Sequence, residues 1–137
     1  MIKIHKDNQD FIFQIEIETT DHETHETVIN RVHDFHEFII KVYTNDIDDF
    51  IEASYQGIGT GIYNNIVEQD DNDFLIIQSQ DLATLEDGIL KFHIEYAISS
   101  TYFGDGFYNE CYDIETGFML VSKRYNNSEC PICLIDD

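Results

Sequence analysis

Hydrophobic and polar residues alternate along several short stretches of the chain, and this period of two predicts β-strands. In "FIFQIEIE", residues 11–18, apolar side chains fall on one face and Gln14, Glu16 and Glu18 on the other. The most regular run is "ILKFHIEYAI", residues 89–98, which places Lys91, His93 and Glu95 opposite an apolar face. Residues 35–44 follow the same rule, with Phe38, Ile40 and Val42 together on one face.

Five shorter segments also favour strands, because they are rich in β-branched and aromatic residues and are separated by Asp, Asn or Gly. They are residues 50–55, 62–67, 74–79, 107–113 and 118–121, the last two joined by a predicted turn "IETG". The one helical candidate is "SQDLATLEDG", residues 79–88, where Leu82 and Leu85 are three apart. We expect a single helical turn there, crossing from one sheet to another.

Seven to nine short strands with little helical periodicity are typical of an antiparallel β-sandwich, immunoglobulin-like in class, or of a partly open barrel. The length of 137 residues suits one domain. We therefore predict a β-sandwich domain over residues 1–121. Residues 122–137 lose the alternation and contain the only proline, Pro131, so we expect a loose C-terminal arm that orders on a neighbour.

The charge balance narrows the range of partners. Twenty-eight Asp and Glu residues stand against seven Lys and Arg, a formal net charge of -21. Such a chain repels phosphate, so direct binding to nucleic acid or to an anionic membrane face is not expected. The charge is compatible with a basic protein partner, with imitation of DNA, or with solubility in a crowded assembly.

Targeting signals and cysteine usage indicate a cytoplasmic origin. The start "MIKIHKDNQD" holds no apolar run of signal-peptide length, and no later window approaches a membrane span. Three cysteines, Cys111, Cys130 and Cys133, make an odd set that suits a reducing compartment. We expect free thiols.

Two histidine pairs suggest metal chemistry, but their spacing argues against it. His22 and His25 in "TTDHETHETV" are three apart, whereas a zincin helix needs histidines four apart. The segment lies between two strands, where a solvated hairpin loop is expected. His33 and His36 repeat the spacing at a predicted strand start, which would separate their side chains.

The cysteine pair of "CPIC", Cys130 and Cys133, matches half of a zinc knuckle or a redox motif. A redox site needs a strand-to-helix junction, and zinc needs two more ligands, of which only Cys111 and a distant histidine are available. The acidic clusters 45–49 and 68–73 lack EF-hand spacing, and the glycines of 55–63 precede no lysine. We therefore predict no metal, no cofactor and no catalytic residue, and hence not an enzyme.

One stretch, "TYFGDGFYNECY", combines aromatic residues with a tight turn. Such side chains can close the end of a sandwich, and they are also the best candidate contact surface. The predicted interaction residues are Tyr102, Phe103, Asp105, Phe107 and Tyr108.

The order of the segments "FIFQIEI", "DFHEFIIKVYTND", "ASYQG", "DGILKFHIEYAI", "FGDGFYNE" and "TGFMLV" resembles small β-sandwich structural proteins of Bacteroidales and crAss-like bacteriophages. The resemblance spans roughly residues 10–121. It implies a virion protein, made in the host cytoplasm, that docks on capsid, portal, tail or fibre proteins. It further implies a homo-oligomer that supports appendage attachment or particle stability, with no catalytic residues.

Two other functions remain open from the sequence. A small acidic inhibitor could mimic DNA in the groove of a host nuclease or defence enzyme. A carbohydrate-binding sandwich would need an exposed aromatic platform, and the chain contains no Trp.

Overall fold

The prediction of an all-β chain is confirmed by the computed structural model, which describes residues 1–6, 10–21, 23–57, 61–99 and 106–122. Strands hold 64% of the described residues and helices 6%. The strands are β1 Ile2–His5, β2 Phe11–Ile15, β3 Ile17–Thr20, β4 Thr27–Asn30, β5 Glu37–Tyr43, β6 Ile51–Gln56, β7 Ile62–Asn64, β8 Ile66–Gln69, β9 Asn72–Ile77, β10 Gly88–Ser99 and β11 Phe107–Val121. The two short helices are the 3-10 helix η1, Val32–Asp34, and the α-helix α1, Ser79–Leu82.

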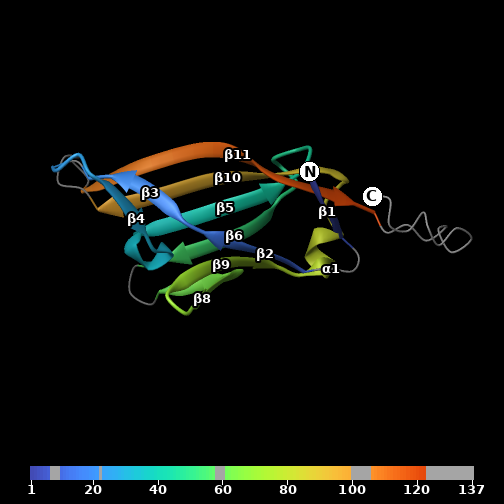
Figure 1. Cartoon of the computed structure of the whole chain (residues 1–137), viewed down its shortest axis with the longest axis horizontal. Helices are drawn as coiled ribbons and strands as arrows, with labels where there is room; N and C mark the ends of the chain where they lie inside the picture. Colours follow the sequence, from blue (N-terminus) through green and yellow to red (C-terminus); the bar gives the residue numbers. More distant parts are fainter. Residues whose placement is uncertain (7–9, 22, 58–60, 100–105, 123–137) are drawn as a thin grey trace, which may run out of the picture.

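The strands form three hydrogen-bonded groups (Figure 1). A large sheet has the order β1-β11-β10-β5-β6-β7, a small sheet the order β2-β9-β8, and β3 pairs with β4 in a hairpin. Pairing is antiparallel throughout these groups except between β1 and β11, which run parallel. The expectation of purely antiparallel pairing is therefore wrong at this one edge.

The structure has more strands than the seven to nine expected from the alternation. Strands β1 and β4 were missed because each has four residues of which one is buried, too few to show a period of two. The predicted strand 62–67 is divided into β7 and β8 at Asn65, whose φ of 55° turns the chain from the large sheet into the small one.

The predicted turn "IETG" is instead a bulge within one long strand, β11. Residues 116–118 lie opposite Leu90 alone, and Gly117 has a φ of 82°. The Thr116 hydroxyl donates to the Leu90 carbonyl at 3.0 Å, which satisfies a ladder position that the bulge leaves open. A bulge and a turn use the same residue types, so the sequence did not distinguish them.

The large and small sheets share one hydrophobic core. The alternation predicted for β5 and β10 is confirmed: their inward side chains are buried, whereas Lys41 and His93 point to the opposite face. Core residues of the large sheet include Phe38, Ile40, Val42, Ala53, Leu90, Phe92, Ile94 and Leu120, and those of the small sheet include Phe11, Ile15, Ile66, Leu75 and Ile77. The outer face of the large sheet is thus free to carry polar side chains.

The helical turn expected within 79–88 is confirmed as α1, which connects β9 of the small sheet to β10 of the large sheet. Leu82 and Leu85 are both buried in the core. The predicted C-terminal arm lies outside the described residues from position 123 onward, and Ser122 donates to the Asp87 carboxylate. No helix in the described ranges has the length and apolar character needed to cross a membrane.

Candidate functional site

A cleft of about 610 Å³ opens between the β3–β4 hairpin and the far end of β10 and β11. Figure 1 shows this hairpin beside the end of the large sheet where β10 finishes and β11 begins. The cleft is lined by Glu18, Thr19, Thr20, Asp21, Glu23, Thr27, Val28, Asn30, Tyr96, Ile98, Ser99, Tyr108 and Glu110.

The floor of the cleft is the inner face of the large sheet at the margin of the apolar core, where Tyr96 belongs to the core and Ile98 packs against it. Cross-strand pairing sets Ile98 opposite Tyr108 and Tyr96 opposite Glu110. The Tyr108 hydroxyl donates to Glu110 Oε2 at 2.5 Å. Burial, with smaller contributions from neighbouring Tyr112 and Glu110, raises the pKa of Tyr96 to about 12. Like an unperturbed tyrosine, Tyr96 keeps its hydroxyl proton at neutral pH, and this hydroxyl can donate a hydrogen bond.

The roof is the β3–β4 hairpin, which is held in shape by side chains of its own. Asn30 is buried and its Nδ2 donates to Thr19 Oγ1 at 2.7 Å across the two strands. At the tip, Asp21 Oδ1 accepts from the backbone N–H groups of Glu23 and Thr24, an Asx-type turn. All three bonds join residues of the hairpin, so they fix the shape of the roof.

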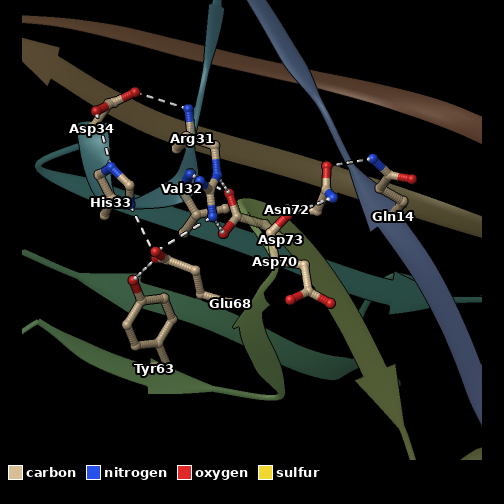
Figure 2. A network of polar contacts seen from close by, with 10 residues as sticks. All are labelled: Gln14, Arg31, Val32, His33, Asp34, Tyr63, Glu68, Asp70, Asn72 and Asp73. Carbon is tan, nitrogen blue, oxygen red and sulfur yellow. Dashed lines mark hydrogen bonds and ion pairs between the residues drawn. The ribbon is translucent and has the colours of Figure 1, made fainter.

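A partly buried ion pair fixes the chain directly after the hairpin. Asp73, only 1% exposed, accepts from Arg31 Nε and Nη2, each at 3.1 Å, and from the Val32 N–H at 2.7 Å. Figure 2 shows the Arg31 guanidinium facing the Asp73 carboxylate. The bidentate pair joins the end of β4 to β9 of the small sheet, so it positions the hairpin relative to the core.

Glu68 extends this network toward the surface (Figure 2). Its carboxylate lies 3.0 Å from His33 Nδ1, accepts from the Tyr63 hydroxyl at 2.9 Å, and lies 3.4 Å from Arg31 Nη2. Two hydrogen bonds lower the pKa of Glu68. The bond to His33 has the larger effect, and the bond to Tyr63 the next largest. Burial and the bond to Glu68 raise the pKa of Tyr63. These contacts connect η1 with β7 and β8 and serve a structural role.

The cleft has an acidic lining. Among the described residues that line it are four acids, Glu18, Asp21, Glu23 and Glu110, and no Lys, Arg or His. With tyrosine rings on the floor, this composition favours a ligand that carries positive charge, because both carboxylates and aromatic faces attract cations.

The predicted interaction residues are only partly placed by the structure. Tyr108 lines the cleft, and the Phe107 ring lies against the His36 ring with centroids 4.1 Å apart. Tyr102, Phe103 and Asp105 lie outside the described residues, as do His22, Cys130 and Cys133.

The other histidines singled out by their spacing lie apart. His25 is exposed in the hairpin turn, with a φ of 62°. His33 lies in η1 against Glu68, and His36 precedes β5 against Phe107. His33 and His36 thus contact different partners, and of the pair His22 and His25 only His25 is described.

Sequence reasoning missed two groupings. Tyr96 and Glu110 meet on the cleft floor, and His93, Glu95 and Cys111 meet on the outer face of the large sheet, with ligand atoms within 4.8 Å of one another. In both cases the residues lie on β10 and β11, and only the register between these strands brings them together. The alternation gave the correct face for His93, Glu95 and Tyr96 on β10, but it assigned no face to Glu110 or Cys111 and no cross-strand neighbour to any of them.

No family model, curated protein or solved structure matches the chain. The fold and the cleft together define an all-β protein with a candidate binding site for a cationic ligand.

Proposed function

We propose that this protein is an immunoglobulin-like β-sandwich structural protein of a bacteriophage virion. It docks on the capsid or tail through protein contacts and supports fibre or appendage attachment or the stability of the particle. The sandwich architecture is supported by the core that the large and small sheets share. The virion role is supported by the resemblance of the segment order over residues 10–121 and by a site that suits binding.

The acidic cleft is the observation that carries the proposal of docking. Its volume of about 610 Å³ lies within the range of roughly 300–1,000 Å³ of ligand sites. We infer that it takes an extended, Lys- or Arg-bearing segment of another virion protein. A cationic side chain there would meet Glu110 and the faces of Tyr96 and Tyr108, and partial exclusion of water strengthens such contacts.

Exposed apolar side chains on edge strands support assembly into a homo-oligomer. Ile2 on β1 is 63% exposed, Ile12 on β2 60%, Ile29 on β4 58% and Ile62 on β7 59%. Each of these strands lies at the edge of its sheet or hairpin. Edge strands with apolar side chains can pair with a strand of another chain.

The alternative of a DNA-mimicking inhibitor receives less support. A DNA mimic requires a face of uniformly negative charge, like that of a phosphate backbone. On the outer face of the large sheet, Lys41 and Lys91 lie among the acids, and Lys41 Nζ approaches Glu95 at 3.9 Å.

The first prediction concerns purified particles of the phage that encodes the chain. We expect mass spectrometry of these particles to detect peptides of this protein, because a virion protein copurifies with the particle.

A second experiment on the same particles is cross-linking. Treatment with a carbodiimide, which joins carboxylates to amines directly, is expected to link Glu110 or Glu23 to a lysine of another virion protein.

A matched pair of variants on β11 tests the cleft separately. Glu110→Gln removes a carboxylate from the cleft floor, whereas Glu115→Gln removes one from the outer face. Only Glu110→Gln is expected to weaken rebinding of the full-length protein to particles that lack it. Particles without these peptides would refute the virion role, and equal effects of the two variants would refute docking through the cleft.

A further inference from the structure

The outer face of the large sheet brings an imidazole, a thiol and two carboxylates together at the centre of β10 and β11. His93 pairs across the strands with Asp113, and Glu95 pairs with Cys111. His93 and Glu95 are two apart on one strand, and so are Cys111 and Asp113, so all four point to the same face. This face lies opposite the apolar core, and none of the four residues lines the cleft.

The distances within this group suit a shared metal ion. His93 Nε2 lies 3.3 Å from Cys111 Sγ and 3.9 Å from Glu95 Oε1, and the three ligand atoms all lie within 4.8 Å of one another. Tetrahedral bonds of about 2.0–2.3 Å place ligand atoms roughly 3.3–3.8 Å apart. Small side-chain rotations of Glu95 and Cys111 are enough to reach that geometry, because both are more exposed than His93.

Asp113 supports the histidine as a metal ligand. Its Oδ1 lies 2.8 Å from His93 Nδ1. In a neutral imidazole that donates its Nδ1 proton to Asp113, the Nε2 lone pair is directed away from Asp113, toward Cys111 and Glu95. Carboxylates that accept from the second ring nitrogen in this way orient histidines and make them more basic in metal sites.

Cys111, His93 and Asp113 are also arranged as in a Cys-His-Asp catalytic triad. The charges around them, however, favour a bound cation over a nucleophilic cysteine. Glu95 is the cross-strand neighbour of Cys111, and the Asp113 carboxylate lies beside His93 on the same face. A nucleophilic cysteine needs positive surroundings that stabilise its thiolate, and these two carboxylates oppose that. A bound divalent cation would offset the same negative charges and would stabilise the thiolate.

We propose that His93, Glu95 and Cys111 bind Zn²⁺, with Asp113 as the positioning residue for His93. Imidazole, carboxylate and thiolate together are ligands that Zn²⁺ prefers. The Cys111 thiol loses its proton to solvent as the ion binds. The fourth position is left for water or for a ligand from another molecule, beside a hollow of about 230 Å³ lined in part by Glu37, Asn109 and Cys111.

Cobalt substitution tests the site, because a thiolate bound to Co²⁺ gives a charge-transfer absorption that carboxylates and imidazoles do not give. The full-length chain carrying Cys130→Ser and Cys133→Ser keeps Cys111 as its single thiol. We expect this protein to bind one Co²⁺ with a charge-transfer band and tetrahedral visible bands, and Zn²⁺ to displace both.

Single substitutions in that background then assign the ligands. Cys111→Ser is expected to abolish the charge-transfer band, and His93→Ala and Glu95→Gln to weaken binding strongly. Asp113→Asn is expected to weaken binding about 10–100-fold while the band remains, as for a residue that acts through the histidine. Glu115→Gln, an exposed acid on the same strand, is the matched control and is expected to leave affinity unchanged.

Three results would overturn the proposal. The first is the absence of a charge-transfer band in the background protein while its circular dichroism shows a folded chain, and the second is a band that persists in Cys111→Ser. The third is an effect of Glu115→Gln equal to that of Asp113→Asn, which would show a general charge effect. None of these outcomes bears on docking through the cleft, which involves the opposite face of the sheet.

Discussion

Among the acids that the structure describes, Asp73 is the one that is buried. Its carboxylate accepts hydrogen bonds from Arg31 Nε and Nη2 and from the Val32 N–H. A buried carboxylate without partners is costly, so its three bonds offset the loss of water. In the sequence Asp73 ends the acidic cluster 68–73, "EQDDND", whose Asp and Asn residues favour a turn. Asp70 and Asp71 do form that turn, with φ of 52° and 63°, whereas Asp73 belongs to β9.

The prediction at this scale is that Asp73→Ala destabilises the protein by about 2–4 kcal/mol. This value is somewhat below that for a fully buried pair, because Arg31 keeps partial access to water. Chemical denaturation measures the change in the free energy of unfolding. Glu16→Ala, at an exposed position between β2 and β3, is expected to cost less than about 0.5 kcal/mol. Similar losses of unfolding free energy for both variants would show that the hydrogen bonds of Asp73 add nothing to stability beyond the effect of its charge.

At the scale of elements, Asn65 decides how β7 and β8 divide between the two sheets. Its Nδ2 donates to the Glu52 carbonyl of β6 at 2.9 Å, and its own carbonyl accepts from the Ile76 N–H of β9 at 2.9 Å. One residue in the left-handed region thus bonds to the large sheet and to the small sheet. Asn tolerates this conformation better than most residues because its side chain can bond locally.

We predict that Asn65→Val destabilises the protein by about 2–3 kcal/mol, the sum of left-handed strain in a β-branched residue and one lost hydrogen bond. Asn65→Gly removes the same hydrogen bond but relieves the strain, so it is expected to cost only about 1 kcal/mol. Thermal and denaturant unfolding of both variants would measure the difference. If the glycine variant were the less stable of the two, strain at Asn65 would not be the governing factor.

At the scale of the whole molecule, the net charge of -21 means that the excess carboxylates on all elements repel one another. Favourable pairs such as Lys6 with Asp87 are few, because the chain has only seven Lys and Arg residues. Repulsion among excess charges destabilises a compact state, and salt screens it. The Debye length falls from about 30 Å at 0.01 M salt to about 10 Å at 0.1 M.

We therefore expect the melting temperature to rise with sodium chloride concentration over this range and then to level off. Each kcal/mol of relieved repulsion corresponds to roughly 3–5 °C for a domain of this size. Calorimetry at neutral pH measures the rise. Potassium chloride should give the same curve at equal ionic strength, since screening does not depend on the cation. A melting temperature that falls with salt would mean that attractive ion pairs outweigh the repulsion.

The sequence by itself determined the class of fold and the burial of most strands. Alternation alone assigned Phe38, Ile40 and Val42 to the core and His93 and Glu95 to the opposite face, because side-chain direction in a strand depends only on position along that strand. The helical turn before β10 was also predictable from the spacing of Leu82 and Leu85.

The tertiary structure alone decided which strands are neighbours and in what register. Local pattern does not encode that β10 lies between β11 and β5, that β1 runs parallel to β11, or that the β3–β4 hairpin covers Tyr96 and Glu110. Both the acidic cleft and the group of His93, Glu95 and Cys111 depend on that pairing. Contacts between residues distant in the sequence are set by the packing of the whole chain, and so these sites were visible only in the folded structure.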